Sequence, residues 1–123
     1  MILVDTSIWI GHLHSPDTML EDLLEREQVL MHPFILGELA VGNLRQRNST
    51  LKHLFKLPQI ATATDQEVLH FVDRQAMFGK GIGFIDAHLL VSVMLTRGVQ
   101  LWTRDKALLA VATRLSLAAA VTH

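Results

Sequence analysis

The sequence predicts an α/β protein, a three-layer α/β/α sandwich around a central, mainly parallel sheet of four to five strands. Short apolar or β-branched runs alternate with longer segments whose apolar residues recur at helical spacing. The short runs are apolar throughout instead of alternating with polar residues, as expected for parallel strands covered on both faces. The length of 123 residues favours a single domain spanning 1–123.

The first half of the chain contains two predicted strands and three predicted helices. The first strand covers 2–6 and ends at an acid. Ser15-Pro16-Asp17 is typical of a helix start, and an apolar stripe continues to about residue 27. Further along, a strand at 29–32 is stopped by Pro33, which opens a helix to about Arg47; a loop at 48–50 and a short helix at 51–57 follow.

The second half predicts a third strand at 59–63 and a helix from Thr64 to about residue 78. Glu67 lies three residues after Thr64, which is the spacing of a capping box. A glycine-rich loop at 79–83 matches neither a Walker A loop nor a dinucleotide fingerprint. The remaining predicted elements are a helix at 84–97 ended by Gly98, a strand at 99–103, a helix at 106–115 and a short strand at 119–122.

The composition indicates a globular domain of the cytoplasm. The chain has no cysteine, its mean hydropathy is +0.30, and its net charge is −1, which argues against a purely electrostatic polyanion binder. Its apolar runs are shorter than the roughly 18 residues of a membrane span, and residues 1–7 lack the basic region of a secretory signal. A local basic cluster consists of Arg45, Arg47, Lys52 and Lys56. It is either a solvated loop or, through the first three residues, an RNA contact.

Four acids stand out from the others because of where they fall. Asp5 ends the first predicted strand, and Asp105 lies two residues after the 99–103 strand. Asp86 heads an apolar helix, and the helical neighbours of Glu38 carry no polar side chain. The carboxyl ends of parallel strands form the usual ligand edge of such a sheet, so we expect these acids to meet there. Asp73, in mid-helix, is interpreted as a surface acid.

Four clustered carboxylates repel one another unless a cation or a proton compensates them. A set of oxygen donors without cysteine suits a hard ion such as Mg²⁺ or Mn²⁺. Two such ions would favour in-line displacement at a phosphodiester. Taken singly, each acid has an equally good structural explanation, such as a helix cap for Asp86 or a turn for Asp105.

The motifs around these acids resemble the PIN-domain family, and within it the short VapC-type toxins of toxin–antitoxin pairs. They are "ILVDTSIWI", "FILGELAVG", "GFIDAHLL" and "LWTRDKAL", with the acids 33, 48 and 19 residues apart. The resemblance covers essentially the whole chain, and it rests on the four motifs in order, since each alone is weakly specific. One departure is Leu89-Leu90-Val91, where the family often has Ile-Ala-Ala.

The resemblance implies a single PIN-like nuclease domain, a Mg²⁺- or Mn²⁺-dependent endoribonuclease that cleaves structured RNA such as tRNA or rRNA and so inhibits translation. Its implied catalytic and metal-binding residues are Asp5, Glu38, Asp86 and Asp105, supported by Thr6 and Thr103. It also implies a homodimer and a cognate VapB-like antitoxin. Arg104, next to Asp105, is a further candidate for RNA contact alongside the basic cluster, although a solvated role is the alternative.

Two other functions remain open from the sequence. One is a catalytically silent module that uses the same sandwich to bind a protein. The other is a phosphoacceptor regulatory domain, since Asp5 and Thr103 fall at strand ends. The second lacks the additional acid beside Asp5 that such a domain requires.

Overall fold

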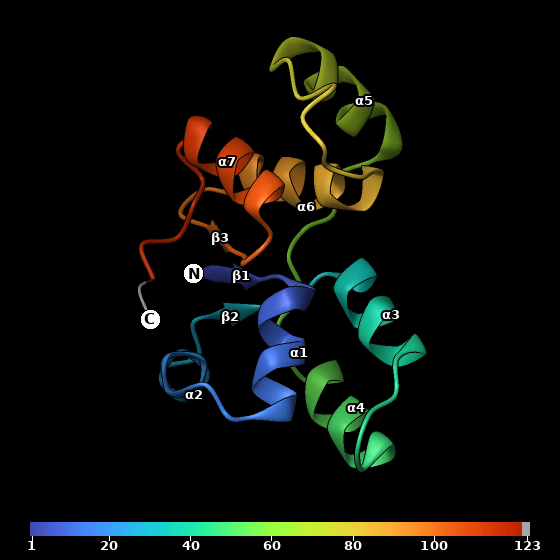
Figure 1. The fold of residues 1–123 in the computed structure, drawn as a ribbon, viewed down its shortest axis with the longest axis vertical. Coiled ribbons are helices and arrows are strands. Elements are labelled where there is room, and N and C mark those ends of the chain that lie inside the picture. The colour runs from blue at the N-terminus through green and yellow to red at the C-terminus, as the bar shows by residue number, and fades with distance from the viewer. Residues whose placement is uncertain (122–123) are drawn as a thin grey trace.

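The computed structural model describes residues 1–121, in which a small parallel sheet is surrounded by helices (Figure 1). Strand β1 (Ile2–Val4) lies in the middle of the sheet, between β2 (Val29–Leu30) and β3 (Gln100–Trp102). Both neighbours run parallel to β1, with Leu3 opposite Leu30 on one side and Leu101 on the other. This order brings the carboxyl ends of all three strands to one edge.

Seven helices connect and follow the strands within the described residues. In the view of Figure 1, α1 to α4 gather below the sheet and α5 to α7 above it. Their bounds are Thr6–His14 (α1), Thr18–Glu25 (α2), Pro33–Val41 (α3), Arg47–Phe55 (α4), Asp65–Arg74 (α5), Phe84–Met94 (α6) and Lys106–Arg114 (α7).

The α/β class and the parallel sheet are confirmed, but the expectation of four to five strands is wrong for residues 1–121. The predicted strand at 59–63 contributes only an isolated parallel bridge from Gln59 to Met31, and Ala118 forms a similar bridge to Leu101. The pairing of Gln59 with Met31 extends no further in part because Pro33 starts α3 directly after His32. Residue 122 of the predicted strand at 119–122 lies outside the described residues.

Several element boundaries also differ from the prediction. The helix predicted to about residue 78 ends at Arg74, and the helix predicted at 84–97 ends at Met94. The first strand ends at Val4, and Asp5 caps a helix, α1, that the sequence reasoning had not assigned. The helix predicted to reach Arg47 ends at Val41, because Gly42 adopts an extended conformation. Gln46 then takes a left-handed conformation, and α4 runs through the loop predicted at 48–50.

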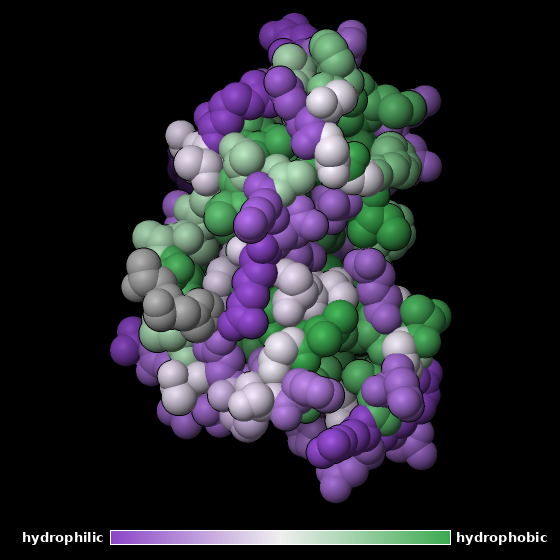
Figure 2. Space-filling view, in the orientation of Figure 1, coloured by the Kyte–Doolittle hydropathy of each residue, from purple (hydrophilic) through white to green (hydrophobic). Residues whose placement is uncertain are grey.

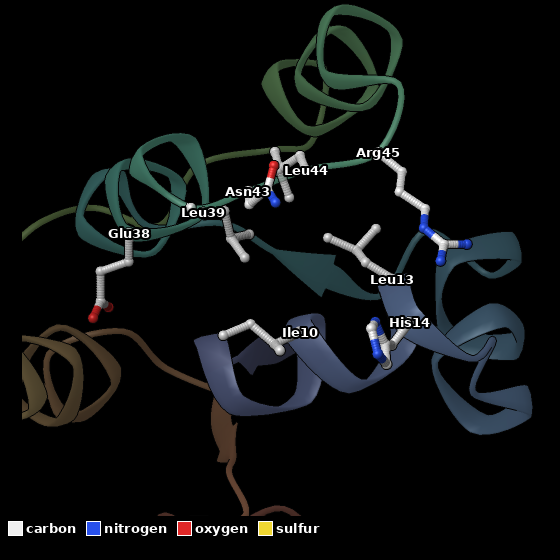
Figure 3. A pocket seen from close by; sticks show the side chains of 9 residues that line it. Ile10, Leu13, His14, Glu38, Leu39, Asn43, Leu44 and Arg45 are labelled. Atoms are coloured by element: carbon white, nitrogen blue, oxygen red, sulfur yellow. The ribbon is translucent and has the colours of Figure 1, made fainter.

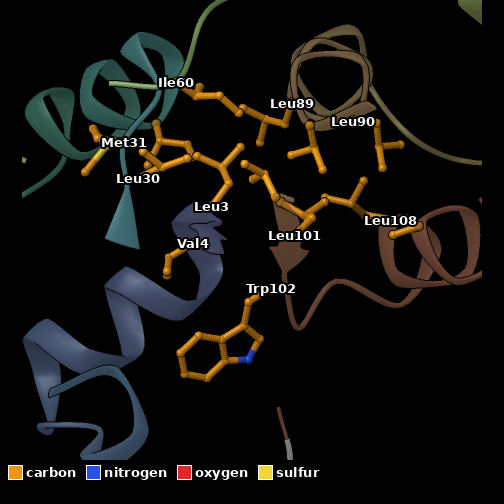
Figure 4. Close-up of a cluster of buried hydrophobic side chains, with 14 of the residues drawn as sticks. Leu3, Val4, Leu30, Met31, Ile60, Leu89, Leu90, Leu101, Trp102 and Leu108 are labelled. Atoms are coloured by element: carbon orange, nitrogen blue, oxygen red, sulfur yellow. The ribbon is translucent and has the colours of Figure 1, made fainter. Parts of the chain in front are cut away.

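The core covers both faces of the sheet. Leu3 and Leu101 point toward Leu89 and Leu90 of α6, whereas Trp102 points to the opposite face (Figure 4). All of these side chains are buried. The bulky Leu89-Leu90-Val91 run is therefore accommodated as core, and it holds the amino-terminal end of α6 against the sheet. In the described part of the chain, no helix is long and apolar enough to cross a membrane.

Candidate active site

Asp5 is the buried centre of a hydrogen-bond network at the carboxyl edge of the sheet. Asp5 is only 6% exposed to solvent. Oδ1 accepts the Thr6 backbone N–H at 2.7 Å, and Oδ2 accepts the hydroxyls of Ser7 at 2.9 Å and Thr103 at 2.6 Å. An ionised carboxylate can accept about four hydrogen bonds. The three bonds therefore leave Oδ1 with acceptor capacity for another ligand.

Backbone N–H groups orient the two hydroxyls that donate to Asp5. Thr103 Oγ1 accepts the N–H of Asp105 at 3.1 Å, and Ser7 Oγ accepts the N–H of Arg104 at 3.1 Å. Because each oxygen is already an acceptor from the backbone, its own proton is available for Asp5 Oδ2. The network joins the ends of β1 and β3 and fixes the orientation of the Asp5 carboxylate.

Glu38 approaches the same edge from α3. Its Oε1 accepts a hydrogen bond from the Thr6 hydroxyl at 2.9 Å. Thr6 therefore contacts two acids, because its backbone N–H donates to Asp5. The Glu38 side chain is exposed, as expected for a residue that faces a cleft. It lies at one end of a groove between α1 and α3, whose floor includes Ile10, Leu13 and Leu39 (Figure 3).

Asp86 is half-buried in the first turn of α6, where Gly83 N–H donates to its Oδ2 at 3.4 Å. Burial is the main cause that raises its pKa above the ordinary value of 3.8. Repulsion from Asp5, Asp105 and Glu38 raises the pKa further, against the effect of the Gly83 hydrogen bond. The other three acids therefore act electrostatically on Asp86.

Asp105 is an exposed N-cap, since its Oδ1 accepts the Leu108 N–H of α7 at 2.9 Å. Asp5 is the N-cap of α1, where its side chain accepts the N–H of Thr6, and Asp86 lies in the first turn of α6. Three helix amino-termini are thus associated with three of the acids, and the positive end of a helix dipole stabilises negative charge. The helix-cap reading of Asp86 and Asp105 is compatible with their meeting at one site.

The acids fit a divalent cation in chemistry but do not form a closed ligand set. Within residues 1–121, no group of three or more His, Asp or Glu side chains is arranged so that it could hold a metal ion. All four donors are hard carboxylate oxygens, which suit Mg²⁺ or Mn²⁺. Burial is the main cause of the raised pKa of Asp86, and the smaller part that comes from repulsion by Asp5, Asp105 and Glu38 is negative charge that a cation would offset.

The four basic candidate residues are all exposed, but Arg104 and Arg47 have partners within the protein. Arg104 lies over α1, where its guanidinium is 3.4 Å from Asp17 Oδ2 and 3.0 Å from the position that a Cβ on Gly11 would occupy. Arg45 lines the far end of the groove that contains Glu38 (Figure 3). Arg47 donates to the Gly42 carbonyl at 3.4 Å, and both it and Lys52 are exposed.

Comparison with known proteins places this arrangement in a family. A family model described as the PIN domain matches residues 2–114. The chain belongs to the PIN-domain family. It is also similar to Ribonuclease VapC32 of Mycobacterium tuberculosis, with 47% identity over 108 residues that cover 88% of this chain and 87% of the relative. The same values hold for the protein from strains CDC 1551 / Oshkosh and ATCC 25618 / H37Rv.

Within this PIN domain, the site includes one residue that the sequence reasoning missed. Ser7 is not among the site residues predicted from the sequence. Its hydroxyl donates to Asp5, two residues earlier. The signal was present in the sequence, because a Ser two residues after an acid at a helix start can bond back to that acid.

Proposed function

We propose that this protein is the toxin of a VapBC-type toxin–antitoxin pair, a Mg²⁺- or Mn²⁺-dependent endoribonuclease that cleaves cellular RNA and inhibits translation. The whole of residues 1–123 acts as one nuclease domain. The observation that carries the proposal is the link between two acids at the carboxyl edge of the sheet, since Thr6 donates its backbone N–H to Asp5 and its hydroxyl to Glu38. Burial, followed by repulsion from Asp5, Asp105 and Glu38, raises the pKa of Asp86, which supports placing Asp86 and Asp105 at the same site. The 47% identity to a protein named as a VapC ribonuclease supports the same activity.

Each acid has a distinct part in the proposed reaction. Asp5 and Asp86 would hold a divalent ion directly, and Glu38 and Asp105 would hold it directly or through water. A divalent ion held there would lower the pKa of an attacking water and offset charge on the phosphate. Thr103 and Ser7 fix the Asp5 carboxylate, and Thr6 fixes Glu38. No histidine is needed as a base.

The phosphoacceptor alternative gains no support from the site. The carboxylate of Asp5 accepts three hydrogen bonds, two of them from hydroxyls whose protons the backbone directs toward it. A carboxylate held in this way is a weaker nucleophile than a free one. The same bonds suit a ligand whose orientation must be fixed.

A cleavage assay on total RNA tests the proposed activity. The purified chain is incubated with RNA in EDTA, in Mg²⁺ and in Mn²⁺. We expect cleavage only with a divalent ion, and its loss in Asp5→Asn. Asp73→Asn is the matched control, because Asp73 is an exposed acid on α5. Cleavage that survives in Asp5→Asn contradicts the site, and no cleavage with either metal favours a silent binding module.

The proposed partners are a VapB-like antitoxin and a second copy of the chain. A cationic residue of an antitoxin segment would complement the four acids, as an ion does. Growth arrest on expression of the chain, relieved by co-expression of the small protein encoded beside it, tests the antitoxin. Sedimentation velocity tests the homodimer.

A further inference from the structure

Two phenylalanines stand half-exposed beside the candidate acids. Phe34 is 39% exposed, and it precedes Glu38 by four residues on α3, so the two share a face of that helix. Phe84 is 49% exposed, and it opens α6 two residues before Asp86. Figure 2 shows hydrophobic surface over α3 and α6 on the right of the molecule. An ion-binding site gains nothing from exposed rings, so these rings call for a separate explanation.

The two rings share one buried neighbour. The His88 ring lies 5.0 Å from the Phe34 ring and 4.8 Å from the Phe84 ring, centroid to centroid, with interplanar angles of 73° and 88°. Edge-to-face pairs of this kind are favourable contacts. Because one imidazole contacts both rings, Phe34 from α3 and Phe84 from α6 form a single aromatic cluster at the rim of the site.

Polar contacts of His88 and of the Phe34 backbone hold the aromatic cluster in place. His88 is 3% exposed, and its Nε2 lies 2.8 Å from Oδ1 of Asp65, the first residue of α5. Below Phe34, the His32 ring accepts the Phe34 backbone N–H at 3.0 Å and lies 5.1 Å from the Phe34 ring. Both phenylalanines therefore lie in the first turns of helices that these contacts fix in place. Because the rings are already ordered, less conformational entropy would be lost when a ligand binds to them.

We propose that Phe34 and Phe84 are stacking residues that hold an unpaired nucleobase of RNA beside the phosphodiester to be cut. This inference rests on the proposed ribonuclease function and adds a determinant of substrate choice to it. Sequence-specific RNA recognition mostly targets unpaired bases stacked on aromatic side chains. The carboxylates act on the phosphate, which is the same for every nucleotide, whereas the rings contact the base. Purines, with the larger π-face, are preferred over pyrimidines.

A second copy of the chain is the competing occupant. A phenylalanine side chain offers about 200 Å² in all, so the exposed parts of the two rings amount to somewhat less than about 200 Å². A stable protein interface needs about 800 Å² from each partner. A subunit interface would therefore need further residues around the rings, whereas the pair alone matches the face of one base and lies on the same helices as Glu38 and Asp86.

The test measures RNA binding without cleavage. Asp86→Asn serves as the background, and the probes are fluorescein-labelled single-stranded RNAs of ten adenosines or ten uridines in Mg²⁺, followed by fluorescence anisotropy. The adenosine strand is expected to bind more tightly. Adding Phe34→Leu or Phe84→Leu is expected to weaken binding of the adenosine RNA by about five-fold or more. The difference in affinity between the adenosine and uridine RNAs is expected to become smaller. Phe34→Trp retains both, and Phe55→Leu, at an exposed ring on α4, changes neither.

Three results would overturn the proposal. One is equal affinity for both strands in the background protein, and another is unchanged binding in both leucine variants. The third is a shift from dimer to monomer in Phe34→Leu during sedimentation, with RNA affinity per chain unaltered, which would assign the rings to a subunit interface. Failure of the ribonuclease proposal has a different signature, since it is an absence of metal-dependent cleavage by the unsubstituted chain.

Discussion

His32 provides a pH-dependent test of the packing beneath the site. The imidazole is 1% exposed and caps α3, with Nδ1 accepting the Phe34 N–H. Burial, followed by repulsion from His88, lowers the pKa of His32 from 6.5 to about 4. The perturbation is His32→Asn, because the Asn side-chain oxygen can accept the same capping bond and does not titrate.

The direction of the pH dependence follows from whether the folded or the unfolded chain binds the His32 proton more tightly. The unfolded chain binds it with a pKa of 6.5 and the folded chain with a pKa of about 4, so acid favours unfolding. The stabilising contribution is present above pH 6.5 and is lost as the pH falls through the folded pKa. The full difference is about 3 kcal/mol, of which about 2 kcal/mol is lost by pH 5.

Urea denaturation at pH 7.5 and pH 5 measures this contribution. We expect the wild-type chain to lose about 2 kcal/mol more stability between these values than His32→Asn does. His70→Asn, at an exposed histidine of α5, is the matched control and is expected to follow the wild type. A pH dependence that is the same in wild type and His32→Asn would refute the reasoning.

Three further substitutions test separate parts of the molecule. Thr103→Val removes the hydroxyl that donates to Asp5 and accepts the Asp105 N–H. We expect the rate of RNA cleavage to fall by about 10- to 100-fold. Urea denaturation is expected to show a loss of about 1.5–3 kcal/mol in the free energy of unfolding. Thr64→Ala breaks the α5 capping box and is expected to cost about 1 kcal/mol in the same denaturation assay, with full helix stability contradicting the cap. Arg45→Gln is expected to lower the slope of log affinity against log salt by about 1 in RNA titrations; an unchanged slope would exclude Arg45 from RNA contact.

The sequence predicted most elements that have strong local signals. The capping box at Thr64 and Glu67 is present, and the helix predicted from residue 84 begins there. The predicted α7 span of 106–115 differs from Lys106–Arg114 by one residue. These elements depend on caps and helical periodicity, which act within a few residues.

The failures involve contacts between distant segments. Strands were predicted at 59–63 and 119–122, yet pairing in these regions is limited to single bridges at Gln59 and Ala118, because pairing length depends on where the partner strand turns away. The position of Asp5 and Asp105 at the carboxyl edge was predicted from their places after two apolar strands. The role of Ser7, and the contact of Phe34 and Phe84 with one histidine, required coordinates because helices distant in sequence meet there.

Thermal denaturation of wild type and Asp86→Asn, with and without Mg²⁺, tests the central claim most directly. The raised pKa of Asp86 means that its charge destabilises the folded chain, so Asp86→Asn is expected to melt at a higher temperature than wild type in EDTA. Mg²⁺ is expected to stabilise the wild type and to have little effect on the variant. Equal stabilisation of both proteins by Mg²⁺, or of neither, would contradict a metal site built on these four carboxylates.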